Sequence, residues 1–413
     1  MSASDARFMR LALRLARRGY GSTSPNPMVG AVLVKGGKII GRGWHRRAGL
    51  PHAEIEALRD AQKRGYNPKG STLYVTLEPC STHGRTPPCT DAIIAAGIKR
   101  VVIGTTDPNP KHSGRASKIL RRAGIEVDWW GERPREPDNQ SKRGSSGASP
   151  HQDLAEECGR LNEAFNHWIV HHTPFVTVKA AMTLDGKIAT ASGESKWITG
   201  ERARNYGMKL RQGADAILVG INTILADDPT LTVRKPMADD RRQTGKPIRR
   251  IVLDSLARTP LKSKVVSDEF AALTTIVVSK RAPKNRVTAL AKRVRVMVVP
   301  TIKVGRAVLC PPSSARSENA PYHIDLRWLL KKLGSENVTS LLVEGGGEVN
   351  ASFLLGGLAQ RVAFFYAPKI LGGRDSRKAV GGEGARSLVE ALQLHKVEWK
   401  KIGEDLLMTA RVA

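Results

Sequence analysis

Cysteine is scarce in this chain: four residues in 413, at positions 80, 89, 158 and 310. So few and so widely spread, they exclude a disulfide framework, and metal binding is the more natural special role for any of them. The chain also lacks an apolar run near the ~20 residues that cross a bilayer, and its N-terminus has no secretory signal. We therefore expect a cytoplasmic protein that contacts no membrane.

Acidic residues are few relative to basic ones: 38 Asp and Glu against 67 Lys and Arg, a formal net charge of +29. Such a field attracts polyanions, so an RNA-editing enzyme is one alternative. The basic residues run all along the chain, however, and do not form one aromatic-interleaved patch. We therefore favour solvated surfaces over specific nucleic-acid binding.

The length and a hydrophobic content of 40% favour a globular protein of two domains. Pro, Ser, Gly and charged residues fill 132–153, which we interpret as a polar linker between domains 1–131 and 154–413. The Arg-rich opening resembles a transit peptide, but a first helix ending near Gly19 is the simpler interpretation.

In the first domain, strand and helix patterns alternate, which indicates an α/β sandwich. The predicted elements are a hairpin over 31–44, a helix over 52–64, a strand over 72–77, a helix over 89–96 and a strand over 100–105. In the second domain, apolar β-branched runs predict a sheet covered on both faces. These runs are 175–189, 216–220, 248–255, 274–279, 294–299 and 340–347, with a polar insertion at 303–322 and a helix at 326–333.

Four residues of the first domain can form a zinc site: His52 and Glu54 in PHAEIEAL, and Cys80 and Cys89 in VTLEPCSTHGRTPPC. One His and two Cys leave the fourth tetrahedral position of zinc open to water. Zinc lowers the pKa of that water toward about 7, and a carboxylate that is not a ligand can move its proton. The set therefore predicts hydrolytic deamination, with Glu54 as the catalytic proton carrier.

Prolines place these residues at helix starts. In a regular helix His52 and Glu54 would point apart, so the pair requires a helix entry, and Pro51 fits one. Pro87 and Pro88 likewise mark a helix entry at Cys89, where the helix dipole favours thiolate.

This pattern resembles the zinc deaminase signature of nucleobase deaminases, which space their cysteines Cys-x-x-Cys. Here eight residues separate Cys80 from Cys89. That spacing, with SPNPMVG at 24–30, is similar to the deaminase domain of the bifunctional riboflavin-biosynthesis family, which joins a diaminohydroxyphosphoribosylaminopyrimidine deaminase to a uracil reductase. The resemblance implies a cytidine-deaminase-like α/β/α domain, in which four residues help to hold the pyrimidine and phosphoribosyl groups: Asn26, His45, His83 and Arg85.

The second half resembles the reductase domain of the same family, whose fold is like that of dihydrofolate reductase. The resemblance rests on KAAMTLDGKIATASGESKWIT, GINTILADDPTLTVR and LVEGGGEVNASFL. It implies an NADPH cofactor contacted by Ala181, Trp197, Thr223, Asp227, Ser255, Gly346 and Gly347. It implies a sugar-phosphate site formed by Ser195, Arg211, Leu231, Arg234 and Glu344.

Physical reasoning supports parts of this second site. Gly345, Gly346 and Gly347 follow an apolar strand and precede a helix, so their backbone amides can cradle phosphates. The resemblance also implies a hydride transfer from nicotinamide to the ribosyl C1′. Lys179, Asp227 and Glu344 are the ionisable candidates for handling the proton there, and we predict Lys179 and Asp227 as catalytic. We thus expect an enzyme that deaminates a phosphorylated ribosylaminopyrimidine and reduces its ribosyl group, and that forms a homo-oligomer. The alternatives are an RNA or nucleoside deaminase and a fused protein with one active domain.

Overall fold

The computed structural model describes residues 1–83, 87–110, 112–130, 150–233, 248–303 and 322–412. Tertiary contacts divide the chain into two compact units, Met1–His172 and Thr173–Ala413. No helix among the described residues is long and apolar enough to span a membrane.

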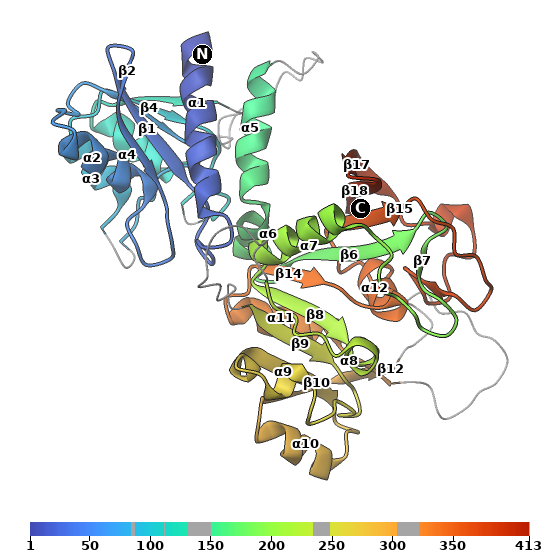
Figure 1. Cartoon of the computed structure of the whole chain (residues 1–413). Coiled ribbons are helices and arrows are strands. Elements are labelled where there is room, and N and C mark those ends of the chain that lie inside the picture. The colour runs from blue at the N-terminus through green and yellow to red at the C-terminus, as the bar shows by residue number, and fades with distance from the viewer. Residues whose placement is uncertain (84–86, 111, 131–149, 234–247, 304–321, 413) are drawn as a thin grey trace. The chain divides into compact units, whose positions relative to one another are not determined.

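The first unit contains α1 (Ala3–Ala16), η1 (Arg17–Gly19), β1 (Gly30–Lys35), β2 (Lys38–Trp44), α2 (Ala53–Lys63), β3 (Thr72–Val75), α3 (Cys89–Ala95), β4 (Arg100–Ile103), α4 (Arg115–Arg122), β5 (Glu126–Trp129), α5 (Pro150–Leu161) and α6 (Glu163–His171) (Figure 1). Its five strands form one sheet in the order β2-β1-β3-β4-β5. β1 and β2 are the predicted antiparallel hairpin, and β3, β4 and β5 are parallel.

The side chains of β1 alternate between two cores because successive residues of a strand point to opposite faces. Ala31 and Leu33 join the core that α2, α3 and α4 cover, whereas Val32 and Val34 join the core with α1 and α5. The predicted α/β/α sandwich is confirmed. Helix α1 packs in the core of this unit, where its residue Leu13 is buried. This agrees with the interpretation of the N-terminus as a first helix.

The boundary between the units differs from the predicted start of the second domain at residue 154. Residues 131–149, most of the predicted linker, lie outside the described residues. Beyond them, α5 buries Leu154 and Cys158 in the same core as α1. Arg17 also forms an ion pair with Glu157. Helices α5 and α6 therefore complete the first unit, and the second begins at Thr173.

The second unit contains β6 (Phe175–Thr183), β7 (Lys187–Ala189), α7 (Glu201–Gly213), β8 (Ala216–Gly220), α8 (Ile221–Asp227), β9 (Arg249–Leu253), α9 (Lys264–Ser267), η2 (Ala271–Leu273), β10 (Thr274–Ser279), α10 (Lys284–Ala291), β11 (Arg295–Val299), β12 (Thr301–Lys303), β13 (Tyr322–Ile324), α11 (Leu326–Ser335), β14 (Ser340–Val343), α12 (Gly347–Leu354), β15 (Arg361–Ala367), β16 (Arg377–Lys378), η3 (Leu388–Glu390), β17 (Leu394–Ile402) and β18 (Asp405–Val412). Nine of these strands form one sheet in the order β11-β10-β9-β8-β14-β6-β15-β18-β17.

The seven strands from β11 to β15 in that order are parallel, and β18 is antiparallel to β15. One face of this sheet packs on α11 and α12, and the other on residues of α8, α9 and α10. The predicted sheet with both faces covered is therefore confirmed. Lys303 and Tyr322, the ends of the predicted insertion, pair in the hairpin of β12 and β13, and 304–321 lie outside the described residues.

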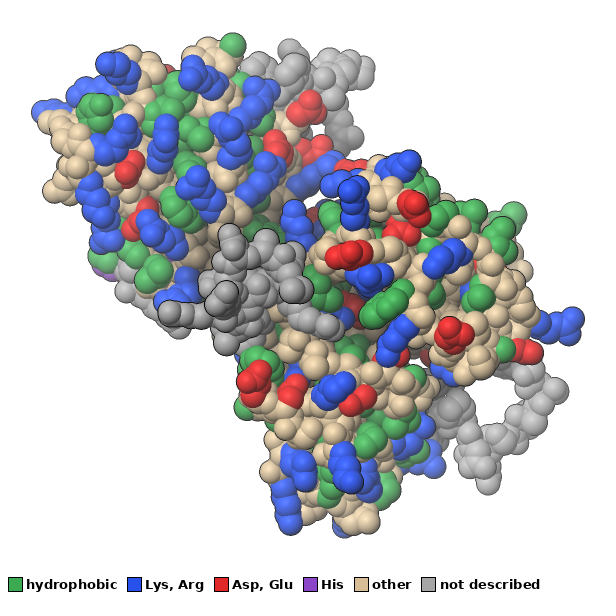
Figure 2. Space-filling view, in the orientation of Figure 1, with side chains coloured by type: hydrophobic (Ala, Val, Ile, Leu, Met, Phe, Trp, Pro, Cys, Tyr) green, Lys and Arg blue, Asp and Glu red, His purple; other side chains and the backbone are tan. Residues whose placement is uncertain are grey.

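Basic side chains are scattered over the surface. Figure 2 shows Lys and Arg on the visible face of both units, interspersed with neutral and acidic side chains and not gathered on one element. This distribution agrees with the expectation of solvated basic faces.

Candidate active sites

A glycine brings helix α2 against the sheet. A Cβ added at Gly43 in β2 would lie 2.1 Å from the carbonyl oxygen of Ala53, the first residue of α2. Only a residue without a side chain permits this close approach, and it fixes the N-terminus of α2. His52 is the N-cap residue with extended backbone (φ −73°, ψ 165°), as the helix-entry interpretation requires.

The three predicted zinc ligands converge. His52 Nδ1 lies 3.5 Å from Cys80 Sγ and 3.4 Å from Cys89 Sγ. Cys89 is the first residue of α3, and its backbone N–H donates to Cys80 Sγ at 3.2 Å. All three ligand atoms lie within 4.8 Å of one another. One imidazole and two thiols at this separation fit a tetrahedral zinc ion with one position left for a non-protein ligand.

The charges of this cluster also suit a cation. The pKa of Cys80 is lowered to about 4, chiefly because its sulfur accepts a hydrogen bond from the Cys89 thiol, with His52 adding to the effect. The pKa of Cys89 is raised, first because it donates that hydrogen bond and then by burial. The pKa of His52 is raised by its contact with Cys80. A cation at the cluster would favour both thiolates.

Glu54 lies beside the cluster and is buried, with 3% of its surface exposed. Its Oε2 has no hydrogen-bond partner among the described residues. Burial, together with the neighbouring Cys80, raises its pKa to about 7. A carboxyl group with such a pKa can both take and give a proton at neutral pH.

His52, Glu54 and Cys80 line a cavity of about 290 Å³ in the first unit. His45 and Asn26 also line it: His45 Nε2 lies 3.2 Å from Asn26 Nδ2, and His45 Nδ1 lies 3.1 Å from the Pro51 carbonyl oxygen. Since that carbonyl can only accept, Nδ1–H donates to it and Nε2 accepts from the Asn26 amide. Burial lowers the pKa of His45, which favours the neutral ring.

Two other predicted deaminase residues are not placed in this cavity. His83 is exposed and does not line it, and Arg85 lies outside the described residues. The cavity also has lining residues that the sequence patterns did not reveal: Glu78, Asp107, Asn109, His112, Phe165, Trp168 and Ile169. The Asp-Pro-Asn-Pro run at 107–110, which begins four residues after the end of β4, is a local signal that could have found some of them.

The second unit gathers charged residues near the carboxyl end of β14. Arg211 Nε and Nη2 donate to the two Glu344 carboxylate oxygens at 2.8 and 2.9 Å. Lys179 Nζ lies 3.6 Å from Glu344. Burial would raise the pKa of Glu344, but Arg211 and Lys179 outweigh it and lower that pKa to about 2. We predicted that Arg211 binds a phosphate. In this structure its Nε and Nη2, the two N–H groups that could hold a phosphate together, bind Glu344.

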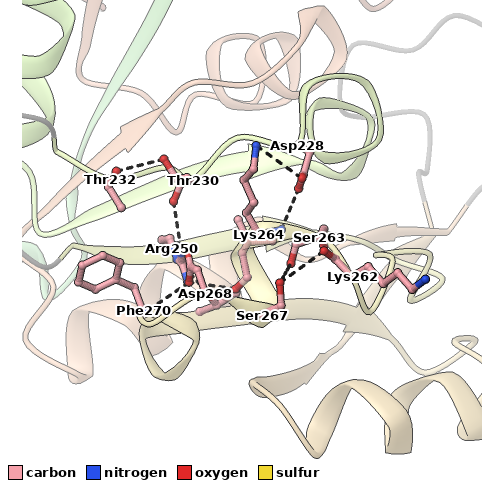
Figure 3. A network of polar contacts seen from close by, with 12 residues as sticks. Asp228, Thr230, Thr232, Arg250, Lys262, Ser263, Lys264, Ser267, Asp268 and Phe270 are labelled. Carbon is pink, nitrogen blue, oxygen red and sulfur yellow. Dashed lines mark hydrogen bonds and ion pairs between the residues drawn. The ribbon is translucent and has the colours of Figure 1, made fainter.

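A loop that follows α8 is fixed at three points. Its residue Thr232 accepts a hydrogen bond from Arg211 Nη1 at 3.1 Å through the backbone carbonyl. The Thr230 carbonyl accepts from Arg250 Nη1 at 2.9 Å, and Asp228 accepts from the Lys264 backbone N–H at 2.8 Å (Figure 3). Leu231 between them is buried, with a positive φ of 52°. Arg234, the next predicted residue, lies outside the described residues.

The residues predicted to contact NADP lie mainly at the carboxyl ends of the parallel strands, the edge where open α/β sheets bind ligands. Thr223 and Asp227 belong to α8 after β8, and Ser255 follows β9. Gly346 and Gly347 follow β14 at the N-terminus of α12, and a Cβ added at Gly346 would meet nothing within 4 Å. This open backbone at a helix N-terminus fits a phosphate of the cofactor.

The remaining predicted residues lie on β6 and in the segment that precedes α7. Ala181 is half-buried on β6 and pairs with Phe365 of β15. Trp197 is 64% exposed, with Arg204 stacked 4.7 Å from its ring. Lys196 forms an ion pair with Asp227 at 3.2 Å, which ties this segment to α8. Ser195 is half-buried next to them in sequence.

Comparisons with known proteins cover nearly the whole chain. Residues 174–408 match the RibD C-terminal domain, and residues 2–105 match the cytidine and deoxycytidylate deaminase zinc-binding region. The riboflavin biosynthesis protein RibD of Aquifex aeolicus (strain VF5) is 42% identical over 404 residues, which cover 98% of this chain and 97% of that protein. RibD of Escherichia coli (strain K12) is 37% identical over 412 residues, with 98% of each covered.

Solved structures agree with this relationship. Form 1 of Acinetobacter baumannii RibD has a TM-score of 0.78 and 31% identity, with 99% of each chain covered. A diaminohydroxyphosphoribosylaminopyrimidine deaminase / 5-amino-6-(5-phosphoribosylamino)uracil reductase of Thermotoga maritima has a TM-score of 0.73 and 32% identity at the same coverage. The chain belongs to the RibD family of bifunctional riboflavin-biosynthesis enzymes, which join a zinc-binding deaminase and an NADPH-dependent reductase in one polypeptide.

Proposed function

We propose that the two sites act in turn on one phosphorylated ribosylaminopyrimidine, as the name of the Thermotoga maritima relative describes. The first site removes an amino group as ammonia, and the second reduces the ribosyl group to ribityl. The observation that carries the proposal is the buried Glu54 carboxyl beside the His52, Cys80 and Cys89 cluster, in a cavity that Glu54, His52 and Cys80 line. A relationship that includes the reductase half disfavours an RNA deaminase.

In the deaminase site, His52, Cys80 and Cys89 would hold zinc, as their spacing and charge support. Zinc supplies the Lewis acidity that lowers the pKa of a coordinated water toward about 7. Glu54 Oε2 would take a proton and return it to the amino nitrogen that leaves. Water contributes the oxygen of the new carbonyl, so one C–N bond breaks and one C–O bond forms. His45 and Asn26 would hold the pyrimidine.

The phosphoribosyl end of the substrate requires cationic or hydrogen-bonding groups. We assign His83 and Arg85 to this end in the deaminase, since both lie in sequence between Cys80 and Cys89. An Arg side chain suits a phosphate because its N–H groups match the oxygen geometry.

In the reductase site, bound NADPH would supply a hydride to the ribosyl C1′. Lys179 and Asp227 would handle the accompanying proton, and the pair of Arg211 with Glu344 would orient the sugar phosphate. Arg211 Nε and Nη2 already bind Glu344. In this proposal, three other residues therefore share the phosphate site: Ser195, Leu231 and Arg234. The open backbone at Gly346 supports a cofactor phosphate there.

A two-stage assay on one purified sample tests this function. Ammonia release is measured first with the phosphorylated diaminopyrimidine, and the fall in NADPH absorbance is measured next. Activity in both stages supports the proposal, whereas activity in one stage alone supports the alternative of a single active domain. We further propose that the protein is cytoplasmic and forms a homo-oligomer. A size measurement in solution tests the oligomeric state.

Changing Cys89 to Ser tests the zinc site separately. The Cys89→Ser variant should purify with much less than one zinc per chain, because a hydroxyl is a poorer ligand than a thiolate. The Cys158→Ala variant is the matched control, since Cys158 is buried outside the cluster and should leave the zinc content unchanged. Metal analysis of both proteins gives the measurement. Full zinc content in Cys89→Ser would contradict the assignment.

A further inference from the structure

The deaminase cavity includes a wall from a distant segment. Phe165, Trp168 and Ile169 of α6 line the same cavity as His52 and Glu54. The match to the deaminase zinc-binding region ends at residue 105, well before this helix. Part of the cavity therefore comes from a segment that the zinc-binding region does not contain.

The wall is apolar and aromatic, in contrast with the polar groups at the cluster. The rings of Phe165 and Trp168 lie with centroids 6.4 Å apart at an interplanar angle of 49°. Both side chains are half-buried, so each keeps surface exposed. Aromatic side chains bind planar heterocycles by stacking, which tolerates many ring substituents.

A hydrogen-bonded residue fixes this helix to the cavity. Asn162, the N-cap residue of α6, is 4% exposed. Its Oδ1 accepts the Met28 backbone N–H at 2.7 Å, and its Nδ2 donates to the Met28 carbonyl at 2.8 Å. Met28 lies in the same loop as Asn26, which lines the cavity. Asn162 thus ties α6 directly to a cavity loop.

We propose that Phe165 and Trp168 form the surface against which the pyrimidine ring packs in the deaminase, and that Asn162 is the positioning residue that holds α6 there. This inference rests on the proposed function, because the ring is that of the proposed substrate. If the proposal holds, α6 helps to determine which substrate the deaminase binds, although in sequence α6 follows the polar segment after β5.

Single substitutions in the full-length chain test the wall. Trp168→Ala and Phe165→Ala should each raise the KM for ammonia release roughly 5- to 100-fold, as loss of one stacking contact does, with a smaller change in kcat. Trp168→Phe should restore most of the affinity, because it keeps an aromatic face. Val170→Ala is the matched control: Val170 lies on the same helix, is exposed and does not line the cavity, so its KM should equal that of the wild type.

Asn162→Ala tests the positioning role. It should raise the same KM while NADPH consumption with the deaminated substrate stays unchanged. Zinc content should also stay unchanged, because the Asn162 side chain binds Met28 and is not one of the zinc-binding residues.

The outcomes separate this inference from the function on which it rests. No ammonia release by the wild type would overturn the proposed function itself. An active wild type with KM values within twofold in Trp168→Ala and Phe165→Ala would overturn the inference alone. A fall in kcat and zinc content at constant KM would also overturn it, because α6 would then only support the fold.

Discussion

Replacing Glu54 with Gln is expected to lower the rate of ammonia release by roughly 10²- to 10⁴-fold, the usual contribution of a positioned proton carrier. Gln keeps the size and shape of the side chain but cannot take a proton. Glu56, the other carboxylate in the first turn of α2, does not line the cavity and so cannot replace Glu54. The reductase activity lies in the other compact unit and should not change.

The measurement compares two reactions on one preparation: ammonia release from the phosphorylated diaminopyrimidine and NADPH consumption with its deaminated product. Zinc content should remain at the wild-type value, since Glu54 is not a ligand. Glu56→Gln is the matched control, because Glu56 lies on the same helix, pairs with Arg46 and Arg59 and does not line the cavity. Loss of both activities in Glu54→Gln would show that the sites are not separable.

The zinc cluster was predictable because its signals are local. Pro51 precedes His52, the extended N-cap residue of α2, and Pro88 is the N-cap residue directly before Cys89. His52 and Cys89 could therefore be placed from their neighbours alone. The residue types then define a zinc site without knowledge of the fold.

The wall of the cavity was not predictable in the same way. Phe165 and Trp168 lie on a short helix whose pattern is that of any partly buried helix. Their contact with the cavity depends on Asn162 reaching Met28, a pairing between segments far apart in sequence. The same long-range packing, of Leu154 and Cys158 against α1, moved the boundary of the unit beyond the polar segment.

The reductase site shows a further limit of sequence patterns. The resemblance was enough to name the residues of this site. It could not predict which charged residues pair with one another. The sequence around Arg211 is compatible with a phosphate or a carboxylate as its partner. Only the fold brings the Glu344 carboxylate to Arg211 Nε and Nη2.

Replacing Arg250 with Met is expected to destabilise the second unit by about 3–5 kcal/mol, the usual effect of removing one partner from a buried ion pair. The Arg250 side chain is 1% exposed and pairs with Asp268 through two hydrogen bonds of 2.6 and 2.7 Å. Its other donors bind Thr274 Oγ1, the Val265 carbonyl and the Thr230 carbonyl. Figure 3 shows Arg250 with Asp268 and Thr230. All five N–H groups are thus used, and Met satisfies none of the acceptors.

Calorimetry of the full-length chain measures the change, with a fall in the Tm of the second unit by roughly 6–20 °C. Arg295→Met is the matched control: Arg295 makes an equally short double hydrogen bond to Glu336, at 2.6 and 2.7 Å, but its side chain is 46% exposed. Solvent screens that pair, so its loss should cost only about 0–1 kcal/mol.

The double variant Arg250→Met with Asp268→Leu separates the ion pair from the other contacts of Arg250. Because no charge then stays unpaired, it should recover part of the stability lost in Arg250→Met alone. The Thr230 carbonyl still lacks its donor in both variants, so the loop that carries Leu231 should remain loosened and the reductase KM raised. Equal destabilisation by Arg250→Met and Arg295→Met would contradict the view that burial, and not hydrogen-bond geometry, gives the Arg250 pair its effect.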